Sequence, residues 1–441
     1  MENIRAPADL IIDAAWIIPI EPQGIVLREH SVVVRDGAIL ALMPTSRAHE
    51  RFEATDQLHL DKHVLIPGLV NTHTHAAMTL LRGYADDLPL MTWLKDHIWP
   101  VEAKHVSAQF VYDGTMLAAV EMLRGGITCV NDMYFFPGDA ARAYARCGMR
   151  ACVGMVVTEF ATNYAVDADD YIDKGLAVRD EFRDHPLLSF CMAPHSPYTV
   201  TDKTFGRLLT IAEELDLPIH LHLHETIEEI EASIAEHGMR PFERLQQLGL
   251  VSPRLIGVHA VHLTPGEIEA LALSGCSIAH CPTSNLKLAS GFAPAAALLA
   301  ADANVALGTD GAASNNRLDM FAEMRMAAVL GKAVANNAAA LPAHEILRCA
   351  TLRGARALGL DHLIGSIEVG KSADLTAVRM DDLETLPCYD PASHLVYVAD
   401  RHQVSHVWVA GQLHIREGSP IGLEISELEI PVRLWHNRMA S

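Results

Sequence analysis

The sequence predicts an α/β fold: a closed (β/α)8 TIM-type barrel with a small β domain built from both ends of the chain. Two observations lead to this prediction. Between residues 64 and 365, short apolar runs alternate with longer segments of helical periodicity, which is typical of parallel strands joined by helices. Outside that region, short β-branched runs and turn signals take over. A chain of 441 residues is too long for one small core and fits a barrel with an accessory domain.

The first 63 residues have the texture of β structure. Short β-branched runs begin at Leu10, Ile25 and Ser31, and Asp36-Gly37 is a strong hairpin turn signal. Residues 366–441 return to this texture, with strand-like runs at 366–378, 404–409 and 412–415. We therefore expect residues 1–63 and 366–441 to form one composite β-sandwich domain, with residues 64–365 forming the barrel between them.

The middle of the chain supplies the strands and helices of the predicted barrel. Helical segments lie at 108–123, 204–215, 227–248, 264–273 and 317–335. The apolar runs number eight, which is the strand count of a closed (β/α) barrel, and catalytic groups in such barrels lie at the carboxyl ends of the strands. The eight runs are 64–75, 127–133, 151–157, 188–195, 218–225, 255–261, 276–282 and 305–310.

Charge and cysteine content narrow the class of protein. The formal net charge is −21, which argues against nucleic acid or an anionic membrane as a partner, because both require a basic surface. None of the eight cysteines forms a Cys-x-x-Cys pair, and several stand inside apolar runs, as expected of core residues in a reducing compartment. With no basic leader and no apolar span of about 20 residues, the expected location is the cytoplasm.

One motif does not support the function that it suggests. Residues 365–372 match the pattern of a phosphate-binding loop, but that loop requires a strand before it and a helix after it. Here a β-like segment, Ala373-Asp-Leu-Thr-Ala-Val378, follows the motif. Gly370-Lys371 is therefore predicted to be a hairpin turn.

Two histidines spaced by one residue, His73 and His75, close the first apolar run of the barrel region. Alternate side chains of a strand point to the same face, so both imidazoles are expected to project together near its carboxyl end. A lone His-x-His pair is usually without function. However, further histidines and an aspartate close later runs in the same way: His220, His222, His224, His259, His280 and Asp310.

Imidazoles combined with one carboxylate are the ligand set of a catalytic divalent metal ion, and zinc is the expected ion. Such an ion lowers the pKa of bound water to about 7. The candidate ligands are His73, His75, Asp310 and one histidine of the 220–224 cluster. Spacing alone does not choose within that cluster, because all three side chains face one way. Glu225 is either a general acid and base or an ordinary acid at a helix start.

Six motifs that occur together and in order resemble those of the amidohydrolase superfamily, in its branch of 5′-methylthioadenosine/S-adenosylhomocysteine deaminases and related chlorohydrolases. The resemblance covers nearly the whole chain, including the split β domain. The motifs are His73-Thr-His75, Ala193-Pro-His-Ser-Pro-Tyr198, His222-Leu-His-Glu-Thr226, His259-Ala-Val-His262, His280-Cys-Pro-Thr-Ser-Asn285 and Leu307-Gly-Thr-Asp-Gly-Ala-Ala-Ser-Asn315.

The resemblance implies which residues bind the metal and which move protons. His222 resembles the third metal histidine of the family, which makes His220 and His224 its neighbours. Asp310 is similar to the metal carboxylate that also takes a proton from the nucleophilic water. Glu225 resembles the acid that protonates the purine ring nitrogen. No lysine near 188–195 is a candidate for a bridging carboxylated ligand, which fits a site with one metal ion.

The resemblance also implies contacts with the substrate. His259 is similar to the histidine that orients the hydroxide and stabilises the tetrahedral intermediate. Glu102, in Trp-Pro-Val-Glu, and His195 resemble residues that contact the nucleoside, and Glu225 and Asp310 are expected to touch the purine as well. Two of these residues have a simpler interpretation. His195 also fits a core histidine, and Glu102 also fits a solvated acid at a helix start.

The function implied is hydrolytic deamination of an adenine nucleoside, namely 5′-methylthioadenosine, S-adenosylhomocysteine or adenosine, with release of ammonia. The first alternative is a related enzyme acting on guanine or another amino- or chloro-substituted heterocycle. A carboxylate suited to a ribose diol, at Glu102, favours the nucleoside over a free base. The second alternative is a catalytically inactive structural relative. The resemblance further implies a homo-oligomer.

Overall fold

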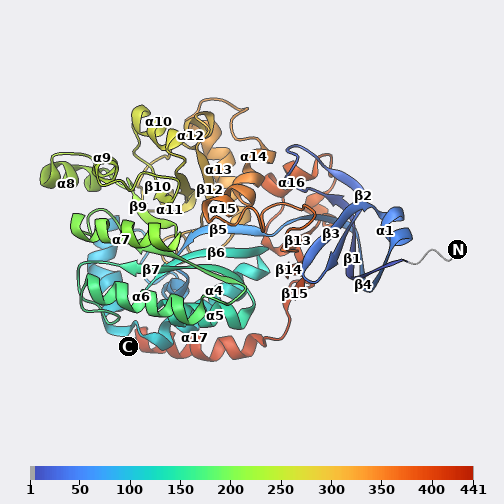
Figure 1. The fold of residues 1–441 in the computed structure, drawn as a ribbon, viewed down its shortest axis with the longest axis horizontal. Helices are drawn as coiled ribbons and strands as arrows, with labels where there is room; N and C mark the ends of the chain where they lie inside the picture. The colour runs from blue at the N-terminus through green and yellow to red at the C-terminus, as the bar shows by residue number, and fades with distance from the viewer. Residues whose placement is uncertain (1–4, 441) are drawn as a thin grey trace.

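The computed structural model describes residues 5–440, and their largest unit is a barrel of parallel strands surrounded by helices (Figure 1). Its eight strands are neighbours in chain order, and each pairs in parallel with the next. They are β5 (Leu69–Thr74), β6 (Ile127–Tyr134), β7 (Arg150–Val157), β8 (Leu188–Pro194), β9 (Ile219–Leu223), β10 (Leu255–His259), β11 (Ser277–His280) and β12 (Asn304–Leu307). The predicted barrel is confirmed.

The barrel closes between its last strand and its first. Thr72 Oγ1 donates to the carbonyl of Leu307 at 2.8 Å, and the backbone NH of Asp310 donates to the carbonyl of His73 at 3.0 Å. Almost every residue of these strands is buried on both faces, as parallel strands covered by helices must be. Closure brings the first and the last of the predicted metal ligands to adjacent strands.

Several helices of the barrel begin at a residue whose side chain accepts from a free backbone NH group of the first turn. Thr201, Thr226 and Thr264 each accept from the NH three residues on, and Thr264 forms a reciprocal capping box with Glu267. The helices over and near the barrel are η1 (Ala76–Leu81), α2 (Leu90–Thr92), η2 (Trp93–Ile98), α3 (Trp99–His105), α4 (Ala108–Arg124), α5 (Pro137–Cys147), α6 (Ala168–Phe182), α7 (Asp202–Leu215), α8 (Ile227–His237), α9 (Pro241–Gln247), α10 (Pro265–Leu273), α11 (Pro282–Lys287), α12 (Ala295–Ala300), α13 (Met320–Val334), α14 (Ala343–Cys349) and α15 (Leu352–Ala357).

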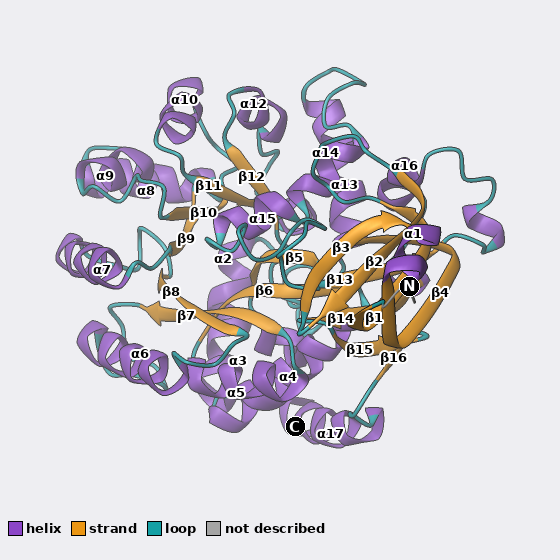
Figure 2. Ribbon diagram, turned by 45° about the vertical axis from the view of Figure 1, so that its right-hand side comes forward, coloured by secondary structure: helices purple, strands orange, loops and turns teal. Residues whose placement is uncertain are grey.

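The predicted β domain is also confirmed, beside the barrel (Figure 2). Its strands form one sheet in the order β16-β15-β14-β13-β4-β1-β2-β3. The four strands from the carboxyl-terminal part therefore join the four from the amino-terminal part where β13 pairs with β4. The sheet curls, because the backbone of Ala38 near one edge bridges to that of Ser372, just before β13. The strands are β1 (Ala6–Ile17), β2 (Leu27–Arg35), β3 (Ala38–Pro44), β4 (Phe52–Pro67), β13 (Leu375–Arg379), β14 (Val404–Val409), β15 (Gln412–Arg416) and β16 (Ser419–Pro420), with helix α1 (Thr45–Arg51) after β3.

The first predicted barrel strand is divided between the two sheets. β4 runs to Pro67 in the small sheet, and β5 begins at Leu69 in the barrel. Gly68 stands between them, where a Cβ atom would lie 2.0 Å from Thr128 Oγ1, so only glycine fits this crossing. We therefore propose Gly68, rather than the junction of residues 63 and 64, as the boundary between the two domains.

The carboxyl-terminal region returns from the small sheet to the barrel. α17 (Ile425–Ala440) packs along α4, where the ring of Trp435 lies 5.2 Å from that of Phe110 and its Nε1 donates to Asp113 at 2.8 Å. The short helices η3 (Leu383–Thr385), α16 (Pro391–Tyr397) and η4 (Arg401–Gln403) link β13 to β14. Residues 366–440 thus contribute to the surfaces of both units.

Three smaller predictions have clear outcomes. Gly370 has a left-handed φ of 92° in a turn that leads to β13, so the segment 365–372 is not followed by the helix of a phosphate-binding loop. All eight cysteines are free, and seven of them are buried. Within residues 5–440, none of the helices has both the length and the apolar character needed to cross a membrane.

Candidate metal centre and active site

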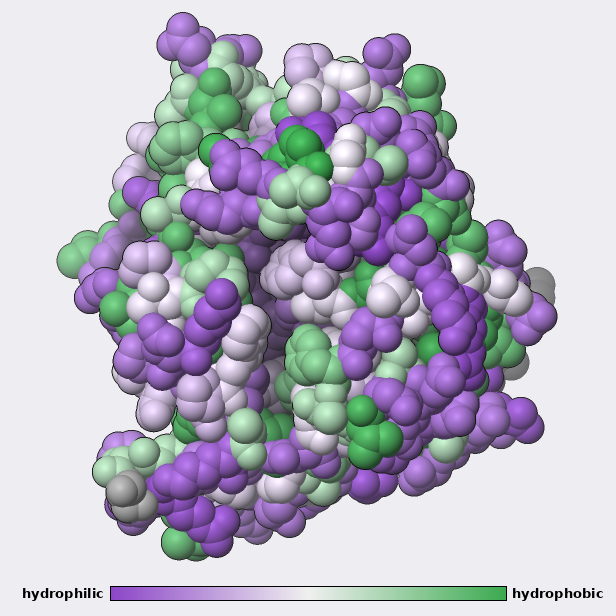
Figure 3. Space-filling view, turned by 90° about the vertical axis from the view of Figure 1, so that its left-hand side faces the viewer, coloured by the Kyte–Doolittle hydropathy of each residue, from purple (hydrophilic) through white to green (hydrophobic). Residues whose placement is uncertain are grey.

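The predicted site residues gather at the carboxyl ends of the barrel strands. β7 points to the left in Figure 1, and Figure 3 shows this face of the molecule with a hollow near its centre. His73 lies in β5, His222 in β9 and His259 at the end of β10, while Asp310 follows β12. These side chains are buried, so strands far apart in sequence place several polar groups in one water-poor space.

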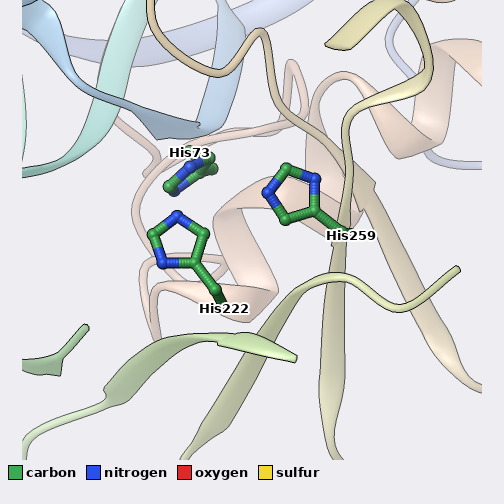
Figure 4. Close-up of side chains that lie close together, drawn as sticks. All are labelled: His73, His222 and His259. Carbon is green, nitrogen blue, oxygen red and sulfur yellow. The ribbon is translucent and has the colours of Figure 1, made fainter. Parts of the chain in front are cut away.

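The nitrogen and oxygen atoms of these side chains converge. Nε2 of His73 and of His75 lie 3.3 and 3.4 Å from Asp310 Oδ1. A second group of three, His73, His222 and His259, has its ligand-type atoms within 4.8 Å of one another. Figure 4 shows the imidazoles of this second group pointing toward a common space. His73 belongs to both groups, which therefore surround one location.

The hydrogen bonds of the imidazoles suit metal binding. Nδ1 of His75 is 2.6 Å from the carbonyl of Met133, and Nδ1 of His222 is 2.7 Å from the carbonyl of His195. Each Nδ1 must therefore carry the proton, which leaves the lone pair on Nε2 for a metal ion. Nε2 of His73 is buried without a hydrogen-bond partner among the described residues. Three such imidazoles with one carboxylate fit a catalytic zinc ion.

Burial keeps these imidazoles in the form that binds metal. Desolvation lowers the pKa of His73 to about 4, with the nearby Asp310 carboxylate opposing the shift. Desolvation also lowers the pKa of His222 well below its usual value, and the surrounding histidines add to the effect. Both rings are therefore neutral at pH 7, as metal coordination requires.

Asp310 is held in one orientation by groups on both of its oxygens. The hydroxyls of Ser284 and Ser314 donate to Oδ2 at 2.6 and 2.7 Å, so Oδ1 faces the histidines. Burial raises the pKa of this carboxyl, but the hydrogen-bonding and charge effects of His73 outweigh it and hold the pKa well below its usual range. Gly311 permits the close approach, since a Cβ there would lie 3.1 Å from His75 Cβ.

Glu225 and His259 form a second pair of groups beside this centre. Glu225 Oε2 is 3.8 Å from His259 Nε2, and Nδ1 of the same imidazole is 2.8 Å from Asn285 Oδ1. The backbone NH of Glu225 donates to Glu229, which fixes the turn after β9. Burial raises the pKa of the Glu225 carboxyl, so it is easier to protonate than an exposed glutamate. Such a group can donate a proton to a bound ligand and recover it.

Glu102 lies on α3, far along the chain from the histidines but beside β6 in space. Tyr134, at the end of β6, donates its hydroxyl proton to Glu102 Oε1 at 2.6 Å. Desolvation raises the pKa of Glu102 to about 7, although the Tyr134 hydrogen bond and the charge of His75 act in the opposite direction. A desolvated carboxylate with one oxygen already oriented is suited to accepting hydrogen bonds from a ligand.

His195 lies beside the centre, after β8. Its ring centroid is 4.8 Å from that of His222, and its carbonyl accepts from both the backbone NH and Nδ1 of His222. Desolvation lowers its pKa to about 3, so the ring is neutral. The residue therefore positions His222 through its backbone and presents an uncharged imidazole to the site.

The remaining histidines of the cluster 220–224 have other surroundings. His224 accepts at Nε2 from the backbone NH of Phe242 at 3.1 Å, and its Nδ1 lies 3.9 Å from Glu267, so its ring is engaged away from the centre. His220 lies behind His73, with its Nε2 3.0 Å from His73 Nδ1. Of the three, His222 is the one that shares a convergent group with His73.

Several residues that orient the site are neither candidate ligands nor candidate catalytic residues in the sequence, where Ser284 and Asn285 are expected to be supporting residues. Ser284 and Asn285 stand in the motif that begins at His280, and Ser314 in the one that contains Asp310, so the motifs did contain them. Tyr134 directly follows the apolar run 127–133 and belongs to none of the six motifs. Only the contact between β6 and α3 reveals it.

The whole chain is similar to known proteins. The model of the amidohydrolase family matches residues 64–414. A protein of Teredinibacter turnerae, named 5-methylthioadenosine/S-adenosylhomocysteine deaminase, is 47% identical over 433 residues, covering 98% of both chains. The crystal structure of an adenosine deaminase from Xanthomonas campestris with bound zinc has a TM-score of 0.98 at 51% identity, covering 99% of this chain and 100% of the other.

A more distant structure shows how widely the fold is shared. The atrazine chlorohydrolase of Arthrobacter aurescens has a TM-score of 0.90 at 23% identity, covering 97% of this chain and 99% of its own, and supports the fold alone. The closer relationship is with the Teredinibacter turnerae and Xanthomonas campestris proteins, which are 47% and 51% identical to this chain. The chain belongs to the amidohydrolase family and, within it, groups with the proteins named 5-methylthioadenosine/S-adenosylhomocysteine deaminase.

Proposed function

We propose that this protein is a metal-dependent hydrolytic deaminase of adenine nucleosides, with 5′-methylthioadenosine and S-adenosylhomocysteine as substrates and adenosine as a further one. One observation carries the proposal. A buried group of imidazoles and Asp310 faces the proton-transfer pair Glu225 and His259, and the carboxylate of Glu102 lies to one side. The names of the similar proteins support the same reaction. The products are the inosine analogue and ammonia.

The proposed ligands are His73, His75, His222 and Asp310, around one ion. A bound divalent ion lowers the pKa of a coordinated water to about 7 and so supplies hydroxide at neutral pH. The donor set and the unpartnered Nε2 of His73 support zinc as that ion. Asp310 also accepts the proton that the attacking water gives up. Its depressed pKa matches a group that holds this proton only briefly.

The other side chains act on the purine. Glu225, whose pKa is raised by burial, protonates the ring nitrogen next to the attacked carbon. Protonation there is needed because negative charge develops on that nitrogen as the nucleophile adds. His259 lies on the same side. Its Nδ1 donates to Asn285 Oδ1 at 2.8 Å, which leaves the lone pair on Nε2 to accept a hydrogen bond from the attacking water and so orient it. Asp310 then passes its proton to the amino group, which leaves as ammonia, and the Glu225 carboxylate recovers its proton from the new hydroxyl as the carbonyl forms.

Glu102 and His195 are proposed to bind the nucleoside. The Glu102 carboxylate accepts hydrogen bonds from the two ribose hydroxyls, while Tyr134 keeps it oriented through one oxygen. A free base has no hydroxyls to offer, so this residue favours a nucleoside over guanine or a triazine. The neutral His195 ring contacts the nucleoside from the carboxyl end of β8.

Removing the Glu102 carboxylate tests the proposed ribose contact. Glu102→Ala is expected to lower kcat/KM for adenosine roughly 10–100-fold, because hydrogen bonds to a charged group contribute about 1.5–3 kcal/mol. Activity on 2′,3′-dideoxyadenosine, which lacks both hydroxyls, should change little and so serves as the internal control. Steady-state ammonia release gives both values. An equal loss on the two nucleosides would show that Glu102 does not contact the ribose.

A smaller effect is expected from Tyr134→Phe, and it depends on pH. Glu102 has a raised pKa of about 7, so its carboxylate is lost as the pH falls through that value, and kcat/KM for adenosine should fall with it. The Tyr134 hydrogen bond lowers this pKa, so removing the hydroxyl should move the acid limb to higher pH. The loss should be roughly tenfold near pH 7 and smaller at about pH 9, where the carboxylate is ionised in both proteins. A pH-independent loss would contradict this role.

Location and assembly follow from the same proposal. We propose a cytoplasmic enzyme that acts on a small nucleoside, without nucleic acid or membrane as partner, and that forms homo-oligomers as inferred from the family resemblance. An inactive relative is a weaker alternative, because the chain keeps all four candidate ligands and both candidate proton-transfer groups, Glu225 and Asp310. Zinc analysis combined with an ammonia assay separates an active enzyme from an inactive one.

A further inference from the structure

Nδ1 is the ring nitrogen that does not face the proposed metal ion, and its hydrogen-bond partner differs among the three candidate histidine ligands. For His75 and His222, the acceptor is a backbone carbonyl, which can only accept a proton. For His73, the partner is the Nε2 atom of another imidazole, that of His220, at 3.0 Å. The two rings meet edge to face, at 73° and 5.0 Å between centroids. His220 is fully buried in β9, one inward-facing position before His222.

Metal binding by His73 determines which nitrogen of His73 and of His220 carries a proton. If His73 gives its Nε2 lone pair to a metal ion, its proton must lie on Nδ1. His220 Nε2 must then be the acceptor, so the proton of His220 lies on its own Nδ1. Within residues 5–440, that Nδ1 has no hydrogen-bond partner. No group on the far side of His220 therefore forces it into one tautomer.

Without the ion, the opposite arrangement is available. His73 Nε2 lies 3.3 Å from Asp310 Oδ1, so a proton on Nε2 is attracted to that carboxylate. His73 Nδ1 then becomes the acceptor, and His220 donates to it from Nε2. A carbonyl in place of His220 could not donate, and Nδ1 of His73 would lose its partner. Only an imidazole or another group that both donates and accepts serves both states.

We propose that His220 is a positioning residue of the metal centre, which accepts the Nδ1 proton of His73 and so holds His73 Nε2 ready for the ion. The inference rests on the proposed ligand set but not on the substrate. His73 and His220 exchange tautomers together when the ion enters or leaves. His220 acts through His73 and touches neither metal nor substrate. Among the three candidate histidine ligands, His73 is thus the one whose Nδ1 is held by a side chain and not by a backbone carbonyl.

Two substitutions at His220 separate hydrogen bonding from packing. In His220→Gln, the side-chain amide reaches about as far as Nε2 and can still accept or donate. His220→Met fills a similar volume but offers no comparable hydrogen bond. Zinc affinity of the full chain is measured by competition with a chromogenic chelator. His220→Met should bind zinc roughly 10–100-fold more weakly, the usual effect of losing an outer-shell partner, and His220→Gln should stay near the wild type.

His280→Met is the matched control. His280 is also a buried histidine in the barrel, at the end of β11, with an unpartnered Nδ1 among the described residues, but it makes no described hydrogen bond to a candidate ligand. Its substitution should leave zinc affinity unchanged. The thermal midpoints of the zinc-free variants show whether each one folds. Wild-type affinity in His220→Met, or an equal loss in His220→Gln, would overturn the inference.

A measurement on the unmodified protein is independent of any variant. Nitrogen-15 NMR of histidine-labelled protein distinguishes Nδ1–H from Nε2–H rings. Adding zinc to the zinc-free protein should convert two coupled rings, assigned by comparison with His220→Gln, from Nε2–H to Nδ1–H. If no ring other than the ligands changes, the inference is wrong. Zinc affinity and tautomers do not depend on which heterocycle is deaminated, so failure here is distinct from failure of the substrate assignment.

Discussion

Replacing His222 with alanine is expected to remove the metal ion and the activity together. The substitution deletes one of four proposed ligands from a site where burial leaves little water to replace it. The loss of affinity should exceed the roughly 10–100-fold that removal of an outer-shell partner costs. Without the ion, the pKa of water returns from about 7 toward 15.7, so hydroxide is scarce at neutral pH. Metal analysis of the purified variant and ammonia release measure the two losses.

His224→Ala is the matched control for this substitution. His224 lies two residues further along the chain, just after β9, and is also buried, but its ring contacts the NH of Phe242 and the carboxylate of Glu267. The variant should therefore retain one ion per chain. Full metal occupancy in His222→Ala with metal loss in His224→Ala would show that His224, and not His222, is the third histidine ligand.

The second large effect is expected for Glu225→Gln. The amide keeps the shape of the side chain but cannot protonate the purine, and one general acid–base group contributes roughly 10²–10⁴-fold to turnover. Because Glu225 is not proposed as a ligand, zinc content and thermal stability should remain those of the wild type. Measuring kcat together with bound zinc separates loss of proton transfer from loss of the ion.

Glu228→Gln provides the comparison within the same turn. Glu228 is an exposed acid in the first turn of α8, three residues after Glu225. Its substitution removes the same charge from the same region without touching the site, and turnover should be unchanged. Near-normal turnover in Glu225→Gln, or an equal loss in both variants, would remove Glu225 from the proposed mechanism.

The barrel could be predicted from the sequence because its strands leave a strong local signal. Parallel strands buried on both faces must be continuously apolar, and the helices between them must carry an apolar stripe. The division at Gly68 left no such signal, because the last four residues of β4, Val64–Pro67, and the first two of β5 are all buried and apolar, and only one residue separates the strands. The distinction lies in which sheet each strand joins, and that is set by contacts with β13 and β6.

The candidate site was predictable where residues close a strand and not where they meet across the fold. His73, His75 and Asp310 could be named from their positions, but alternation placed His220, His222 and His224 on one face without ranking them. The ranking depends on what each ring contacts. His220 contacts His73, and His222 belongs to the convergent group. His224 contacts Phe242 and Glu267. Similarly, the contact between Tyr134 and Glu102 joins two segments 32 residues apart that no short pattern relates.

The central claim, that the protein deaminates adenine nucleosides, is tested most directly by ammonia release from the zinc-loaded enzyme over a panel of substrates. The panel contains 5′-methylthioadenosine, S-adenosylhomocysteine and adenosine, with adenine, guanine and a chlorotriazine as competitors. The proposal predicts the highest kcat/KM for the nucleosides and poor turnover of adenine, because only a nucleoside offers ribose hydroxyls to Glu102. A preference for guanine, adenine or the chlorotriazine over every adenosine analogue would contradict it.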